Sequence, residues 1–173
     1  MTSTYSKYVA FVLLLTMSFS GCSVSYKFNG ASIDYSKTHS ISIADFPNNA
    51  ELVNPNLANQ FSEALRDQYR RQTRLTVLRQ DGDMQLEGEI TGYRIDNTAI
   101  SATDNYAAET KLTISIKVRF KNNANPEDDY EKTYTAYQTF DSSQMLTAVQ
   151  DELCNTMINE IVEQIYNDTV AKW

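Results

Sequence analysis

The segment Glu109–Lys121 constrains the fold more than any other part of the chain, because apolar and polar side chains alternate along it. Alternation with a period of two is typical of a β-strand with one buried face and one face in water. A sheet built on such a strand needs cover on only one side. The apolar set is Leu112, Ile114, Ile116, Val118 and Phe120, and the polar set is Lys111, Thr113, Ser115, Lys117 and Arg119.

Two helices with one apolar stripe each are predicted to supply that cover. Asn54 followed by Pro55 favours a helix start, with asparagine as N-cap and proline at the first helical position. A second, longer helix is predicted over residues 143–170. The first stripe consists of Leu57, Phe61, Leu65 and Tyr69, and the second of Val149, Leu153, Met157, Ile161 and Ile165, widened by Ile158 and Val162.

Shorter alternating segments indicate further strands at 39–46, 75–78, 84–95 and 130–140, the last with Tyr134 and Ala136 facing inward. In 84–95 the apolar positions change phase near Gly88 and Gly92, which predicts a bulge or bend, because one extra residue reverses the side chains that follow it. The predicted fold class is α+β: a two-layer sandwich with two helices packed on one face of a mostly antiparallel four-stranded sheet.

Residues 1–22 have the features of an export signal that ends in a lipid-attachment cysteine. Lys7 precedes an apolar run, Tyr8–Phe19, of about a dozen residues, which is shorter than the roughly 20 needed to span a membrane. Small residues, Ser20 and Gly21, stand directly before Cys22, although Phe19 occupies the place where bacterial lipoproteins usually carry leucine. An ordinary secretory signal is the alternative, and a transmembrane anchor is disfavoured by length and by the lack of basic residues after the run.

The predicted organisation has three parts. Residues 1–21 are a lipoprotein signal peptide, residues 22–37 a lipidated N-terminal tether, and residues 38–173 a single α+β domain, since the mature chain is long enough for one compact domain. The net charge is −7, and −8 without Lys7, which opposes binding to nucleic acid. Lipidation would use Cys22 and leave Cys154 as a free thiol, interpreted as a small buried side chain.

No catalytic set stands out, so the chain is not predicted to be an enzyme or to need a metal or other cofactor. The chain has one histidine, His39, in a polar stretch, and the sequence contains no nucleophile elbow, phosphate-binding glycine loop or zinc motif. Asp81-Gly82-Asp83 is similar to the start of a calcium loop, but the following positions belong to a strand pattern, so the triplet is interpreted as a solvated turn.

The chain resembles the lipopolysaccharide-assembly lipoproteins of the outer membrane, the LptE family, over residues 20–168. The resemblance rests on Gly21-Cys22 followed by the aromatic Tyr26, on the amphipathic C-terminal helix, and on the ordered segments ISIADFPNNA (41–50), NPNLANQFSEALRDQYRR (54–71), LTVLRQDGDMQLEGEITGYRI (75–95) and ETKLTISIKVRF (109–120). No single motif among them is specific, but the ordered set of motifs is moderately specific.

The resemblance implies a non-enzymatic outer-membrane lipoprotein, lipid-anchored and facing the periplasm. Family members plug a large β-barrel that delivers lipopolysaccharide to the cell surface, help that barrel to assemble, and are thought to bind the glycolipid. The polar sheet face makes Lys111, Lys117 and Arg119 candidate barrel contacts. Near Asp104, Asn105 and Tyr106 the chain lacks the basic residues implicated in relatives, so the candidate glycolipid contacts are Arg70, Arg71 and Arg74, from a basic set that also holds Arg66 and Arg79.

Two other classes of function remain open at this point. An envelope adaptor or pilotin-like lipoprotein for another outer-membrane complex would have the same signal and fold, and its partner would distinguish it. A lipid-anchored hydrolase would need a nucleophile and a base, and His39 is the one histidine available.

Overall fold

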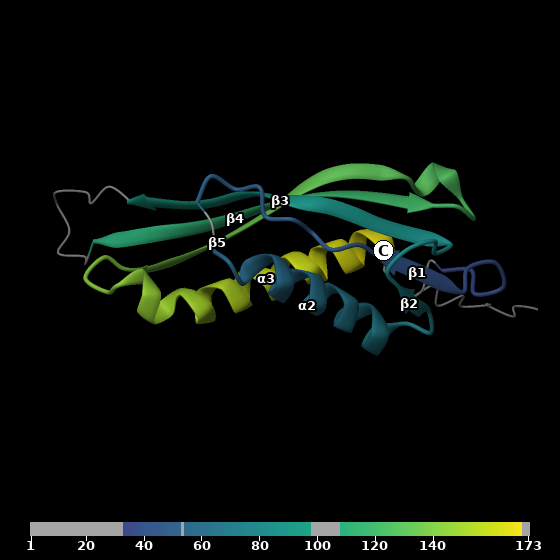
Figure 1. Ribbon diagram of the computed structural model, residues 1–173, viewed down its shortest axis with the longest axis horizontal. Helices are drawn as coiled ribbons and strands as arrows, with labels where there is room; N and C mark the ends of the chain where they lie inside the picture. Colours follow the sequence, from purple (N-terminus) through teal and green to yellow (C-terminus); the bar gives the residue numbers. More distant parts are fainter. Residues whose placement is uncertain (1–32, 53, 98–107, 171–173) are drawn as a thin grey trace, which may run out of the picture.

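The computed structural model describes residues 33–52, 54–97 and 108–170, and both helices lie on one face of a single sheet (Figure 1). The predicted signal peptide, Cys22 and the segment Asp104–Tyr106 lie outside these residues. The elements are β1 (Ser40–Ile43), α2 (Leu57–Gln72), β2 (Thr76–Leu78), β3 (Met84–Asn97), β4 (Glu109–Asn122), η2 (Pro126–Asp128), β5 (Tyr130–Asp141) and α3 (Leu146–Thr169).

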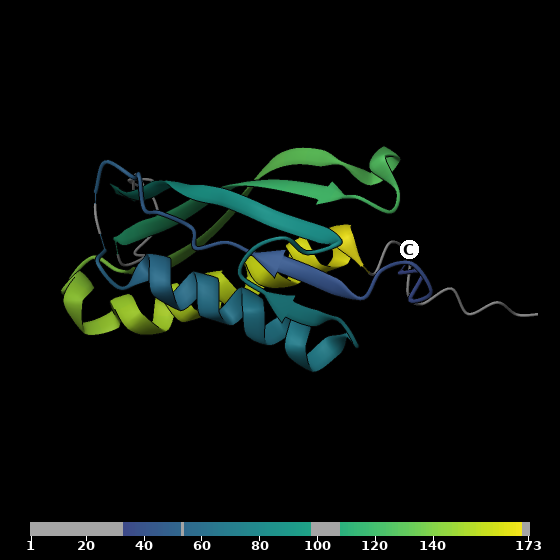
Figure 2. The ribbon, with the colours of Figure 1, turned by 45° about the vertical axis from the view of Figure 1, so that its right-hand side comes forward.

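The two-layer α+β prediction is confirmed, with one difference in the sheet. The sheet is mixed and has five strands in the order β2-β1-β3-β4-β5, one more than predicted. Every segment with a strand pattern has joined it, including the short β2, which pairs with β1 at the far edge. The antiparallel part consists of β3, β4 and β5, whereas β1 runs parallel to both β2 and β3 (Figure 2).

Strand β4 has the two faces that its sequence predicts. Its apolar set is almost completely buried, with Leu112, Ile114, Ile116 and Val118 at 0% exposure and Phe120 at 1%. Tyr134 and Ala136 of β5 face the same layer and are also buried. The core therefore lies between this side of the sheet and the two helices, and the other side of the sheet stays polar.

The bulge predicted in β3 is present. The register of β3 against β4 shifts between Ile90 and Gly92, so the side chains after the shift regain the inward positions. Gly88, just before it, leaves room for a close approach: a Cβ atom there would lie 2.0 Å from the carbonyl oxygen of Lys117 and 2.7 Å from Cε1 of Phe46. The Phe46 ring takes the space that a side chain at residue 88 would need.

The segment after β1 continues along the edge of β3 without forming a full strand, so β1 is shorter than the predicted 39–46. The amide of Ala44 donates to the carbonyl of Leu86 at 3.0 Å, that of Ile90 to Pro47 at 2.9 Å, and that of Asn49 to Ile90 at 2.9 Å. These bonds satisfy backbone groups of β3 at and beyond the end of its pairing with β1.

Both helices begin later than predicted. Asn54 accepts a hydrogen bond from the Asn56 amide at 3.0 Å and forms a turn, after which α2 begins at Leu57. Likewise, Asp141 accepts from the Ser143 amide at 2.8 Å, and α3 begins at Leu146. The predicted stripe of α2 is at 0% exposure throughout, and in α3 the second half of the stripe is buried while Val149 and Leu153 are half-buried.

A cluster of hydrogen bonds holds the C-terminal end of α3 against its neighbours. The carboxylate of Asp168 accepts from the Tyr134 hydroxyl and from the Lys132 ammonium, both at 2.7 Å. On the other side of α3, the hydroxyls of Tyr69 and Thr169 are hydrogen-bonded in the core. Thus α3 is fixed to β5 and to α2 at the same end.

Neither helix in the described part of the chain combines the length and apolar character needed to cross a membrane.

Candidate functional site

The candidate site is the side of β3, β4 and β5 that faces away from the helices, called here the polar face. Its central row is the polar set of β4, and each residue of that row has one neighbour on β3 and one on β5. From the end nearest β1 outward, the face changes from charged side chains to hydroxyls and then to a mixed zone.

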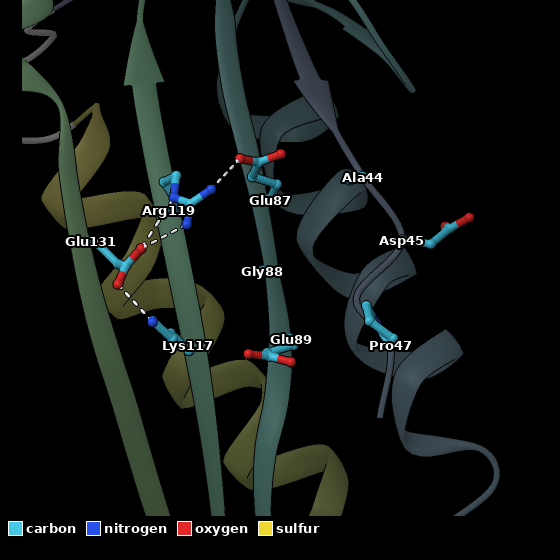
Figure 3. Close-up of a pocket in the computed structure, with 9 residues that line it drawn as sticks. All are labelled: Ala44, Asp45, Pro47, Glu87, Gly88, Glu89, Lys117, Arg119 and Glu131. Atoms are coloured by element: carbon cyan, nitrogen blue, oxygen red, sulfur yellow. Dashed lines mark hydrogen bonds and ion pairs between the residues drawn. The ribbon is translucent and has the colours of Figure 1, made fainter. Parts of the chain in front are cut away.

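The charged zone is an ion-pair network centred on Arg119 (Figure 3). Its guanidinium lies 3.0 Å from Glu131 and 3.1 Å from Glu87, and the ammonium of Lys117 lies 2.7 Å from Glu131. Hydrogen bonds donated by Lys117 and Arg119 lower the pKa of Glu131, and donating to Glu131 and Glu87 raises the pKa of Arg119. Two of the three predicted barrel contacts, Lys117 and Arg119, therefore lie close together, and carboxylates neutralise their charges.

A shallow pocket of about 390 Å³ adjoins this network, between the strands and the segment that follows β1. Glu89 is one of its lining residues and accepts a hydrogen bond from the Asn49 side chain at 2.6 Å. Asp45 points away from the other carboxylates (Figure 3), toward Arg66 and Arg79. Within the described residues, no group of three or more histidine, cysteine or acidic side chains is placed to hold a metal ion.

The hydroxyl zone lies next along the strands. The Ser115 and Thr135 hydroxyls are 3.0 Å apart, and the Thr91 hydroxyl donates to the Ser115 carbonyl at 3.3 Å. A second pocket of about 410 Å³ opens here, lined in part by Thr91 and Ser115 and by Arg94 and Leu52. Such a surface offers neutral donors and acceptors with little net charge.

Lys111, the third predicted barrel contact, lies in the mixed zone, away from the other two. Its ammonium is 5.7 Å from the centre of the Tyr137 ring, a distance at which a cation and an aromatic face attract each other. No ion pair of Lys111 forms within the part of the chain that the structure describes. Its charge is thus the most available of the three.

The predicted glycolipid contacts lie on the helical layer. Arg70 and Arg71 occupy the last turn of α2 and Arg74 follows in the loop before β2, all three exposed. Arg70 forms an ion pair with Asp67 at 2.8 Å. The structure therefore brings Arg70, Arg71 and Arg74 to one end of one helix, but on the opposite layer from the polar face.

Arg66, a neighbour of that basic set in sequence, has a structural role instead. It is 2% exposed, pairs with Asp45 and with Glu63, and donates to the Ile43 carbonyl. One helical turn earlier, the Ser62 hydroxyl accepts the Phe46 amide at 3.1 Å. Hydrogen bonding to Arg66 lowers the pKa of Asp45. Sequence reasoning missed that Ser62 and Arg66 bind the segment 43–46, and the local signal was that these two polar side chains lie four residues apart beside the apolar stripe.

The residues considered for catalysis or metal binding make structural contacts, are buried in the core or lie on the surface. The Asp83 carboxylate accepts the backbone amides of His39 and Ser40 at 2.8 and 3.0 Å, which lowers its pKa and fixes the start of β1. Cys154 is fully buried, as predicted, and burial raises the pKa of its thiol. His39 is exposed on the surface at that same strand end. That the chain is not an enzyme stays a prediction.

Comparison with known proteins gives one family. The model of the LptE lipopolysaccharide-assembly family matches residues 38–169. No curated protein matches the chain. Among solved structures, the hypothetical protein CT253 from Chlamydia trachomatis superposes with a TM-score of 0.51 at 12% identity, over 76% of this chain and 98% of that one, which shows a shared fold. Two further structures are the rare lipoprotein B from Shewanella oneidensis (TM-score 0.47, 12% identity, 75% and 92% covered) and a minor lipoprotein from Acinetobacter baumannii (0.44, 10%, 71% and 90%).

Proposed function

The chain belongs to the LptE family of lipopolysaccharide-assembly proteins, and from this we propose that it is an outer-membrane lipoprotein that plugs and helps assemble the β-barrel lipopolysaccharide translocon. In this proposal a lipid on Cys22 anchors it to the membrane, and residues 38–173 form the plug. Its action supports transport of lipopolysaccharide to the cell surface. The match over residues 38–169 is the observation that carries the proposal.

The polar face supports this role physically. The lumen of a large barrel is polar and wet, so a plug must present a surface that stays hydrated while it makes specific contacts. On the polar face the strongest charges are already compensated by one another, as in the network of Lys117, Arg119 and Glu131. Such a surface can enter a polar lumen without leaving isolated charges unpaired. Lys111, without an ion-pair partner in the described residues, is the charge best placed to meet a carboxylate of the barrel.

For the glycolipid, the proposal assigns the exposed arginines at the end of α2. Phosphate groups of lipopolysaccharide are anionic, and arginine binds phosphate through paired hydrogen bonds. Arg70 forms an ion pair with Asp67, whereas Arg71 and Arg74 are exposed, so at least two guanidinium groups at this helix end face the solvent. Binding at such an exposed cluster would weaken with salt, because charges are screened beyond about 8–10 Å.

Two sets of charge reversals test the proposal and serve as controls for each other. One set is Lys111→Glu, Lys117→Glu and Arg119→Glu, and the other is Arg70→Glu, Arg71→Glu and Arg74→Glu. Both change the net charge equally, on opposite layers. We expect the first set to reduce co-purification with the barrel from outer membranes, and the second to reduce binding to lipopolysaccharide in a salt-dependent manner.

The controls address folding and the alternative function. Glu131 would lie beside new like charges in the first set, so thermal melting of both variants should be compared with the parent protein. In cells depleted of the protein, the barrel should accumulate in a misassembled form. Normal barrel assembly in such cells would refute the plug role and leave an adaptor or pilotin-like role for another outer-membrane complex, which the co-purified partner would identify.

A further inference from the structure

The outer edge of β5 is a long strand edge without a backbone partner in the described structure. An unpaired edge presents a row of N–H and C=O groups that can pair with another chain, and proteins usually block it with short strands, bulges, proline or charge. In the strand order of the sheet, β5 is the outermost strand on its side, next to β4.

Other edges of the sheet are short or partly covered. At the opposite rim, β2 is only three residues long. Where the pairing of β1 with β3 ends, the segment from Ala44 to Asn49 continues along β3 and takes up its backbone groups at Leu86 and Ile90. A short strand therefore limits one edge, and the covering segment takes up part of another.

Strand β5 has none of these features. It is 12 residues long, contains no proline or glycine, and pairs with β4 in one unbroken register from Glu109↔Asp141 to Phe120↔Tyr130. A regular antiparallel strand without a bulge keeps its backbone groups in two straight rows. The outer row is thus geometrically ready to accept a further strand.

The hydrogen bond beyond the end of the ladder shows which residues form that outer row. The amide of Ser142 donates to the carbonyl of Ala108 at 2.8 Å, so the even-numbered positions of β5 point toward β4. The odd-numbered positions point their N–H and C=O groups away from the sheet, and their side chains are exposed or nearly so. Among residues that the structure describes, no backbone group pairs with this row: Glu131, Thr133, Thr135, Tyr137 and Thr139.

We propose that this outer edge is a strand-addition site for an extended, uncharged segment of the β-barrel partner, an inference that rests on the proposed function. The eight residues Thr133–Phe140 carry no charge, with Glu131 and Lys132 at one end and Asp141 at the other. A charged residue in the added strand would face no opposite charge over this stretch. Tyr137, 61% exposed, offers an aromatic surface beside the added strand.

Net charge and strand pairing favour this occupant over a second copy of the chain and over a wall strand of the barrel. A second copy of the chain would bring two molecules of net charge −7 together, and like net charges repel. The wall strands of a closed barrel are already paired on both sides, so they cannot supply the added strand. The partner segment is therefore a loop or terminal segment of the barrel protein that reaches the plug.

Proline at an outward-pointing position tests this without breaking the ladder to β4. Thr135→Pro removes one outward N–H group and should be tolerated in the fold, since an edge strand accepts proline where its N–H faces solvent. Thr135→Ala keeps that N–H and is the matched control. In the full lipidated chain, we expect Thr135→Pro to reduce co-purified barrel at least about tenfold and Thr135→Ala to leave it unchanged.

Hydrogen exchange provides a second measurement that does not depend on the variant folding. In the wild-type complex with the barrel, the outward amides of Thr133, Thr135 and Tyr137 should exchange much more slowly than in the free protein. Equal co-purification of both variants, or unprotected amides in the complex, would overturn the strand-addition site while leaving the plug proposal intact. Pairing of differently tagged copies of the chain through this edge would overturn the choice of occupant, and absence of any barrel with the wild-type chain would overturn the proposed function as well.

Discussion

Replacing Ile116 with alanine should destabilise the protein far more than replacing its neighbour Lys117. Ile116 is at 0% exposure at the centre of β4, where its cross-strand neighbours are Ile90 on β3 and Tyr134 on β5. The two side chains at 116 and 117 point to opposite faces of the same strand. Comparing them therefore isolates the effect of the face from that of the position.

The structure places the cost of Ile116→Ala in the upper part of the usual range. Truncating a buried isoleucine to alanine costs about 2–5 kcal/mol, and more when the surroundings cannot close the cavity. Here both neighbours are held: the Tyr134 hydroxyl donates to Asp168 at 2.7 Å, and the Ile90 amide donates to Pro47 at 2.9 Å. We therefore expect about 3–5 kcal/mol. Lys117→Ala removes an exposed ion pair to Glu131, which keeps Arg119, and should cost about 0.5 kcal/mol or less.

Equilibrium unfolding in urea, followed by circular dichroism, measures both free energies of unfolding. Parallel transitions with the same slope would show that only the stability changed. If Ile116→Ala and Lys117→Ala had equal costs, the assignment of the two sheet faces would be wrong. A loss below about 1.5 kcal/mol for Ile116→Ala would refute the argument that its neighbours are rigid.

Three further predictions use the same unfolding measurement. Gly88→Ala should lower the free energy of unfolding by more than about 2 kcal/mol, because the new Cβ meets the backbone of β4. Gly92→Ala should lower it less, because the nearest contact there is a side-chain Cβ at 3.2 Å. Equal losses would contradict the close approach at Gly88. Asp81→Gly should stabilise the turn by about 0.5–1 kcal/mol, since Asp81 has a φ of 58°, and a loss of stability would refute this. Arg66 lowers the pKa of Asp45 in the folded state. The contribution of the Asp45 carboxylate to the free energy of unfolding is therefore fully present above the ordinary pKa of 3.8 and is lost as the pH falls through the folded pKa. Asp45→Asn should therefore lose less stability on acidification than the parent protein does.

Much of the fold follows from local patterns. The alternation around Ile116 fixes the two faces of β4, and the phase change near Gly92 predicts the bulge, because both depend on the period of a strand. The starts of the helices were misplaced by a few residues, since Asn54 and Asp141 cap turns that precede them rather than the helices themselves. A short side chain that accepts a backbone amide has the same sequence signal in both cases.

The candidate site was less predictable, because its properties depend on which strands become neighbours. Lys117 and Arg119 were identified on the polar face, but their neutralisation needs Glu131 from β5 and Glu87 from β3. In the same way, Arg66 was grouped with exposed arginines, and its partner Asp45 lies 21 positions earlier in sequence. Such long-range pairs leave no periodic trace, so only the tertiary structure reveals them.

The pairing of β1 also determines the order in which the chain can fold. Both strands beside it, β2 and β3, come later in the sequence, and the Tyr69 hydroxyl meets its partner Thr169 across 100 residues. The consecutive strands β3, β4 and β5 can form from local hairpins, but β1 and α2 have no complete surroundings until the last helix is present. Contacts so distant in sequence form slowly, because the intervening chain must first be ordered. A chain that leaves a ribosome N-terminus first would thus complete its core only after nearly all of it has emerged.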